Sequence, residues 1–63
     1  MDPDANLAEQ ERLISEMATS DDTTDADIVL LAKLRYALSR WLQSGGFEPD
    51  WTAGPTARRF YKR

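Results

Sequence analysis

Apolar residues recur at helical spacing in two stretches of the chain, separated by a polar segment and followed by a pair of glycines. The first stretch predicts a helix over about residues 3–18, and the second predicts a helix over about residues 24–44. Residues 19–25 are rich in Ser, Thr and Asp, whose side chains bond to nearby backbone and compete with helix formation. The pattern therefore predicts an antiparallel helical hairpin.

The second predicted helix carries the stronger apolar face. At about 100° per residue its large apolar side chains fall in one broad arc, with Leu38 near the middle, so we expect Leu38 in the core. The arc contains Leu30, Leu31, Leu34, Ala37, Leu38, Trp41 and Leu42, with Ile28 at its edge. Thr24 is the predicted N-cap. Gly45 suits the left-handed residue that closes a helix, and we expect substitution of Gly46 to matter less.

The first predicted helix begins at Asp2 and Pro3, which are favourable N-cap and first-turn residues. Its apolar stripe is narrow, and such a helix needs a partner helix to persist. Leu7, Ile14, Met17 and Ala18 share one face, and Leu13 lies to one side.

An aromatic turn follows the glycines. Because Pro49 prevents the helix from resuming, the chain can fold back, and Trp41, Phe47 and Trp51 are expected to form one cluster. The predicted fold is therefore all-α, an antiparallel helical hairpin closed by this C-terminal turn.

Residues 1–51 are the predicted domain, and residues 52–63 are predicted to be a basic tail, either a short helix or an arm. Truncation before Ala57 is accordingly expected to leave the fold intact.

A chain of 63 residues has a marginal core, which is usually supported by disulfides, a metal or a partner chain. The chain contains no Cys and no His, so a partner is the support that we expect, and two hairpins could pair into a four-helix bundle as a dimer. Val29 and Tyr36 form a small apolar strip on the polar side of the second helix. They are either ordinary exposed residues or a contact surface for a second copy or another partner.

The composition argues against catalysis, because there is no imidazole to act as acid or base and no thiol nucleophile. Asp21 and Asp22 lack the glycine and the late glutamate of a calcium loop, so neither a metal nor a cofactor is expected. The chain has no long apolar run, and its acidic N-terminus is unlike a signal peptide. We therefore expect a non-enzymatic protein of the cytoplasm.

The net charge of −3 divides unevenly along the chain. Residues 1–27 carry nine acids and one base, and residues 28–63 carry seven bases and two acids. This asymmetry indicates either docking of a charged partner or attraction between the two ends of the chain.

The C-terminal residues are the candidate for nucleic-acid binding, since cations neutralise phosphates and aromatic rings stack on bases. They are Arg58, Arg59, Phe60, Tyr61, Lys62 and Arg63. The acidic pI of about 4.7 opposes this interpretation, and we favour a tail that is solvated or docked on the first helix.

The run from Trp41 to Trp51 resembles a Trp-Leu-x-x-Gly-Gly-Phe-x-Pro-x-Trp motif of small uncharacterised proteins encoded by actinobacterial phages. Residues 2–7 fit the Asp-Pro-Asn-like opening of those proteins. Arg40 departs from their pattern, and the basic tail extends past their usual end.

The resemblance implies a small accessory protein in the cytoplasm of the host bacterium. We expect it to bind a protein, either a second copy of itself or a host or phage protein. Nucleic-acid binding through the C-terminal residues is the alternative. Val29 and Tyr36, together with residues 58–63, are the predicted partner-binding residues.

Overall fold

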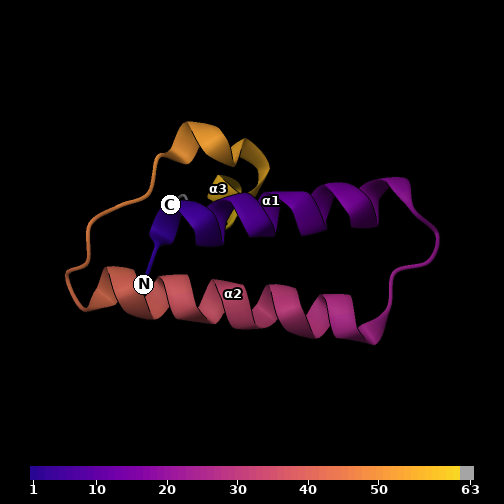
Figure 1. Ribbon diagram of the computed structural model, residues 1–63, viewed down its shortest axis with the longest axis horizontal. Helices are drawn as coiled ribbons and strands as arrows, with labels where there is room; N and C mark the ends of the chain where they lie inside the picture. Colours follow the sequence, from indigo (N-terminus) through magenta and orange to yellow (C-terminus); the bar gives the residue numbers. More distant parts are fainter. Residues whose placement is uncertain (62–63) are drawn as a thin grey trace.

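The computed structural model describes residues 1–61, and this part of the chain is all-α. Its elements are α1 (Pro3–Thr19), α2 (Asp25–Gln43), the 3-10 turn η1 (Trp51–Ala53) and α3 (Pro55–Tyr61). The first two helices lie side by side and run in opposite directions (Figure 1). Lys62 and Arg63, two of the predicted partner-binding residues, lie outside the described residues.

Both long helices begin at the predicted N-caps. The Asp2 carboxylate accepts hydrogen bonds from the amides of Asp4 and Ala5, at 3.0 and 3.1 Å. The Thr24 hydroxyl accepts from the amide of Asp27, whose carboxylate in turn accepts from the amide of Thr24. These bonds satisfy amides that have no partner within the helix, and they explain why the predicted starts are close to those observed.

The two glycines after α2 have different constraints. Gly45 has a φ of +88°, as predicted for the residue that closes a helix. Gly46 packs against Trp41, and a Cβ placed there would overlap the Trp41 indole ring. The expectation that Gly46 is the more tolerant of the two positions is contradicted, because the indole leaves no room for a side chain.

The core is organised around α1. This helix packs along α2, η1 and α3, whereas the backbone of α2 comes close only to α1 among the described elements and meets α3 through side chains. Leu7, Leu38 and Ala57 are fully buried where these elements meet, which confirms the prediction for Leu38. Therefore α1 is the central helix, although its apolar stripe is the thinner one.

The buried face of α1 is wider than its apolar pattern predicts. Leu13, which we placed beside the stripe, is only 2% exposed, and Ala18, which we placed on it, is exposed. Asn6 and Gln10 are buried on the same face. The stripe looked thin because two of its members are amides, and it is wide because other elements cover α1 on more than one side.

The apolar arc of α2 is only partly covered. Leu38 is fully buried, but Leu30 is 40% exposed, and Ala37 and Ile28 are also exposed. Since α1 is the only described helix that runs along α2, the predicted arc is broader than the surface that the core buries.

The predicted tail is part of the folded unit as far as it is described. Ala57 of α3 lies in the core, and the Glu11 carboxylate of α1 accepts hydrogen bonds from the amides of Ala57 and Thr56, at 2.8 and 3.3 Å. The ion pairs of the described residues lie within α1, where Arg12 contacts Glu9 and Glu16. Residues 52–61 therefore do not form a tail outside the domain, because burial and amide bonds attach them to α1.

The predicted cluster of Trp41, Phe47 and Trp51 is divided between two separate ring pairs. The rings of Trp41 and Phe47 lie 5.3 Å apart, edge to face, and those of Trp51 and Tyr61 lie 5.5 Å apart. Trp41 and Trp51 both pack against the core, while Phe47 remains exposed. The difference arises because η1 carries Trp51 toward α3.

Candidate protein-interaction surface

A hollow of about 470 Å³ lies between α2 and the last turn of α3. Its walls are mainly apolar, and we name it the α2 groove. It is lined by Ile28, Leu31, Ala32, Arg35, Tyr36, Ser39 and Phe60. Because α1 covers a different side of α2 and α3 reaches only the edge of the groove through Phe60, the groove side chains remain open to solvent or a partner.

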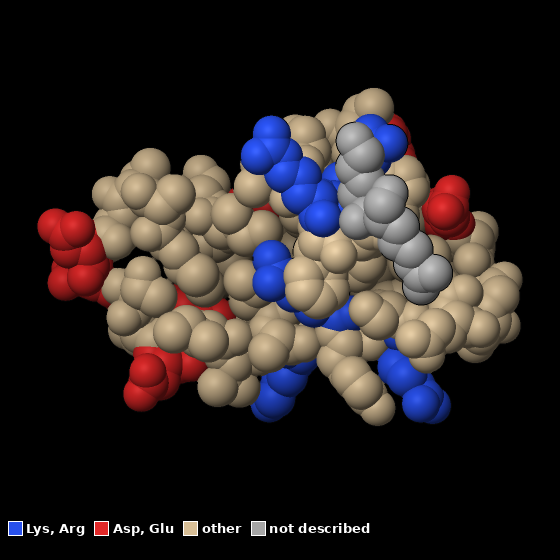
Figure 2. All heavy atoms as spheres, turned by 180° about the vertical axis from the view of Figure 1, so that it is seen from behind, with Lys and Arg blue, Asp and Glu red and all other residues tan. Residues whose placement is uncertain are grey.

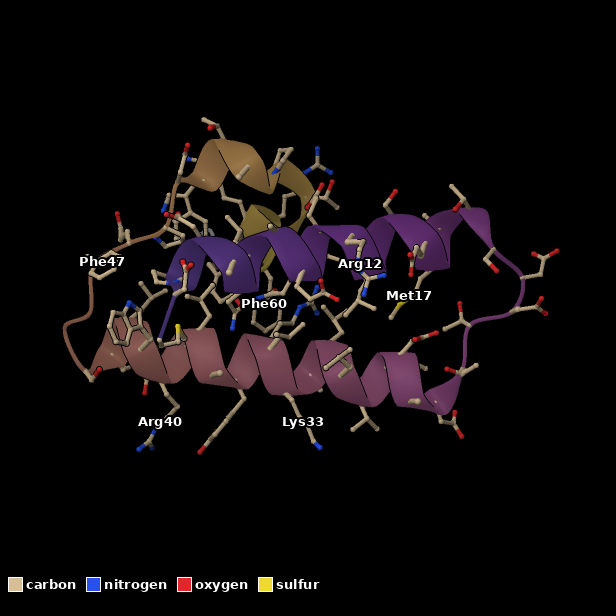
Figure 3. All side chains as sticks on the ribbon, in the orientation of Figure 1. Arg12, Met17, Lys33, Arg40, Phe47 and Phe60 are labelled. Atoms are coloured by element: carbon tan, nitrogen blue, oxygen red, sulfur yellow. The ribbon has the colours of Figure 1, made fainter. Side chains whose placement is uncertain are left out.

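The side of the groove formed by α3 is held in place by Arg35 and Phe60. The guanidinium carbon of Arg35 lies 4.3 Å from the centroid of the Phe60 ring, which is cation–π geometry. The Arg35 Nε atom is buried and has no hydrogen-bond partner among residues 1–61. The Phe60 ring also packs edge to face on Tyr61, at 5.0 Å between centroids. Figure 3 shows Phe60 beside α2.

The structure brings together two of the predicted partner-binding residues. Tyr36 of α2 and Phe60 of α3 are 67% and 54% exposed and line the same groove. Val29 is half exposed on α2 but does not line the groove. Arg58 and Arg59 are exposed on α3.

The α3 cations belong to a different part of the surface. Arg58 lines a second hollow of about 290 Å³, together with Glu48, Trp51 and Tyr61. The predicted site residues therefore divide into an apolar set at the groove and a cationic set on α3.

Tyr61 links α3 to α1 through a hydrogen bond. Its hydroxyl donates to the Gln10 Oε1 atom at 3.2 Å or accepts from the Gln10 Nε2 atom at 2.9 Å. Burial raises the pKa of Tyr61 above its usual value, against the opposing effects of this hydrogen bond and of the nearby Arg35 charge. The half-buried ring packs on the core.

A chain of buried amides continues from Tyr61 to α2. Gln10 Nε2 also donates to Asn6 Oδ1 at 2.7 Å, and Asn6 Nδ2 donates to the Leu34 carbonyl at 3.0 Å. Three helices are thus joined through two side chains of α1, and this network fixes α3 and its Phe60 beside α2.

The remaining groove residues were not predicted as a site. Ile28 and Leu31 were assigned to the core arc, and Ala32, Arg35 and Ser39 were not assigned a role. Their spacing along α2 places them on one side of that arc. The spacing shows that these residues share one side of α2, but the groove forms only because α3 lies beside that side.

Charges flank the groove unequally. Asp25 and Asp27 stand in the first turn of α2, while Lys33 and Arg40 lie further along it and point away from α1 (Figure 3). In Figure 2 acidic side chains gather at the left end, where α2 begins, and basic ones line the lower edge along α2. The outer face of α2 is therefore negatively charged where the helix begins and positively charged further along it.

Residues 1–61 contain no group of three or more His, Cys, Asp or Glu side chains arranged to hold a metal ion. None of their helices combines the length and the apolar character that crossing a membrane requires.

Compared with known proteins, the chain matches no family model, no curated protein and no solved structure. Its function is therefore argued from its own surface.

Proposed function

We propose that this chain is a non-enzymatic accessory protein that acts by binding another polypeptide through the α2 groove. The observation that carries the proposal is the groove itself, where Ile28, Tyr36 and Phe60 expose large apolar surfaces side by side. Scattered exposed apolar residues are ordinary, but a contiguous apolar hollow with a polar rim is typical of an interaction site.

The groove residues have the chemistry of an interface centre. Fully burying a large apolar side chain stabilises a complex by about 1.5–3 kcal/mol, so residues that are already half buried retain about half of that gain. Tyr36 keeps most of its gain because it is the most exposed of them. Tyr and Arg are enriched among the residues that dominate binding energies, and Tyr36 and Arg35 are adjacent here.

Three carboxylates serve as hydrogen-bond acceptors within the fold. The pKa of Glu9 is lowered by its hydrogen bond to Arg12, and that of Asp50 by its bonds to Thr52. Desolvation opposes the same change at Glu11, but the amide bonds from Ala57 and Thr56 lower its pKa. These groups are ionised hydrogen-bond acceptors within the fold, whereas a general acid at neutral pH needs a raised pKa.

The resemblance to small actinobacterial-phage proteins supports a phage accessory role in the cytoplasm of the host. Within the motif the aromatic turn is tied to the end of α2, with Trp41 Nε1 donating to the Phe47 carbonyl at 2.8 Å. The residues after Phe47 then lead to η1 and α3.

Nucleic-acid binding is the second candidate, supported by the exposed Arg58 and Arg59. Its stacking component is weakened, because Arg35 covers the Phe60 ring and Tyr61 is bonded to Gln10. We therefore place it behind protein binding.

An affinity capture with paired variants tests the proposal. A tagged chain is incubated with actinobacterial lysate to which an untagged copy has been added, and bound protein and nucleic acid are measured. We expect Tyr36→Glu to abolish protein capture, because it places a charge on the groove. The double variant Arg58→Gln/Arg59→Gln should retain it. If the chain captures nucleic acid, and only the double variant loses that capture, nucleic-acid binding would replace protein binding as the function.

A further inference from the structure

We infer that the occupant of the α2 groove is a second copy of this chain, paired through antiparallel α2 helices on a two-fold axis at Ala32. The inference rests on the proposed function and names its partner. Three features of the described residues support it: the order of side chains on α2, the charge along that helix, and the area that a partner must cover.

The order of side chains makes the outer face of α2 complementary to itself. Ile28, Ala32 and Tyr36 are spaced four residues apart and line the same groove. When two such helices run antiparallel about Ala32, the Ile28 side chain of each copy meets Tyr36 of the other. The small alanine lies at the crossing, where it allows close approach, and a two-fold interface requires this kind of reciprocal match.

The charge along α2 selects the antiparallel direction. Asp25 lies one turn before Ile28, and Arg40 lies one turn after Tyr36. Antiparallel pairing brings the acidic start of each helix to the basic half of the other, whereas parallel pairing brings like charges together. Complementary potentials set the orientation of an interface and suppress the wrong one.

The area required favours a partner as long as α2. A stable interface buries about 800 Å² per partner. The whole chain exposes 4533 Å² and measures 37 by 21 Å across its largest face, so the partner must extend along most of that face. A second α2, with 19 residues and a length of about 28 Å, provides this extent. Two α1–α2 units then form a four-helix arrangement, with Phe60 at each edge.

Single cysteines test the axis, because the chain has no Cys of its own. A residue on a two-fold axis meets its own copy, so Ala32→Cys should form a disulfide-linked dimer under mild oxidation at micromolar concentration. Ala37→Cys is the matched control, since Ala37 is an exposed alanine on the same helix, about 140° around it from Ala32. We expect at least tenfold slower crosslinking there.

The solution mass of the unmodified chain completes the test. The expected result is a mass of twice 7.2 kDa at micromolar concentration, which returns to 7.2 kDa in Tyr36→Glu. A monomeric unmodified chain, or equal crosslinking of the two cysteine variants, would overturn the second-copy partner. If such a monomer still captures another protein in a Tyr36-dependent way, the proposed function survives and only this inference fails. If neither self-association nor Tyr36-dependent capture occurs, both fail.

Discussion

Gln10 is the residue at which the three α-helices are joined. Its side chain is fully buried in α1 and bonds to Asn6 on the same helix and to Tyr61 on α3, while Asn6 reaches the Leu34 carbonyl on α2. A buried amide with satisfied bonds fixes the relative positions of its neighbours, whereas a half-satisfied one is costly. The placement of Phe60 beside α2 therefore depends on a polar residue in a position that an apolar pattern does not reveal.

The coupling between Gln10 and Tyr61 is measurable by a double-mutant cycle. We expect Gln10→Leu and Tyr61→Phe each to reduce the free energy of unfolding, Gln10→Leu by about 1–3 kcal/mol because Asn6 and the Tyr61 hydroxyl lose a partner. The double variant should cost less than the two added together, by at least ~0.5 kcal/mol. Chemical denaturation of the four proteins measures this, and strictly additive effects would show that the bond is not formed.

Gly54, like Gly46, lies where the fold leaves no room for a side chain. A Cβ at this position would lie 2.7 Å from the Leu7 Cγ atom, and Leu7 is fully buried. We expect Gly54→Ala to reduce stability by about 1–3 kcal/mol through overpacking.

Gly45→Ala provides the comparison for Gly54→Ala. Nothing lies within 4 Å of a Cβ at Gly45, so only the left-handed φ is strained, at a cost of about 1–2 kcal/mol. Leu7→Ala removes the side chain that a Cβ at position 54 would meet. In that background we expect Gly54→Ala to cost less stability, whereas the cost of Gly45→Ala should be unchanged. Thermal melts in which Leu7→Ala relieves neither variant would contradict the contact.

At the scale of elements, α3 is attached to α1 by the carboxylate of Glu11. The amides of Thr56 and Ala57 stand at the start of α3, where they have no partner within the helix, and Glu11 accepts from both. Ala57 then brings its methyl group into the core. This seven-residue helix is too short to persist alone, so its structure depends on these contacts.

The Glu11 contact makes stability depend on pH. The pKa of Glu11 lies below its ordinary value of 4.5, so its contribution is complete above that pH and is lost as the pH falls through the lowered value. We expect the melting temperature to fall below pH 4.5, and to fall less in Glu11→Gln, which starts from a lower stability at pH 7. If the melting temperatures of the two proteins fall equally from pH 7 to 3, the loss of stability in acid comes from other carboxylates, such as Glu9 and Asp50.

Removal of residues 57–63 tests α3 as part of the core. The deletion exposes Leu7 and removes the Tyr61 hydrogen bond, and we expect a loss of about 3 kcal/mol or more, comparable to truncation of a buried aromatic residue. For a chain of this size that lowers the melting temperature by more than ~10 °C. The matched control is the full chain with Arg58→Gln and Arg59→Gln, which should melt within a few degrees of the unmodified protein. Equal melting temperatures for the deletion variant and the full chain would show that α3 does not contribute to the core and that residues 52–63 are a tail.

At the scale of the whole molecule, the predictable features were those that local sequence determines. Asp2 and Thr24 mark helix starts, Gly45 marks a stop, and Leu38 lies at the centre of its arc, because caps and periodicity act within a few residues. Contacts between distant residues were not predictable, such as that of Glu11 with Ala57, 46 positions later.

The candidate site shows the same division. Tyr36 and Phe60 were each identified from the sequence as candidate contacts, but the α2 groove requires both, and they meet only because α3 packs on α1 beside α2. Arg35 and Ala32 were not identified, because an arginine and an alanine on a helix carry no signal until a neighbouring element is placed beside them.

Contact between the outer face of α2 and a protein in the cell is tested most directly by site-specific photo-crosslinking. A benzophenone amino acid replaces Tyr36 in one variant and Ser15, exposed on α1, in a control. After irradiation of cells that produce these variants we expect a protein adduct from position 36 and little from position 15, with a self-adduct at twice 7.2 kDa. Equal adducts from the two positions, or none from position 36, would contradict such a contact.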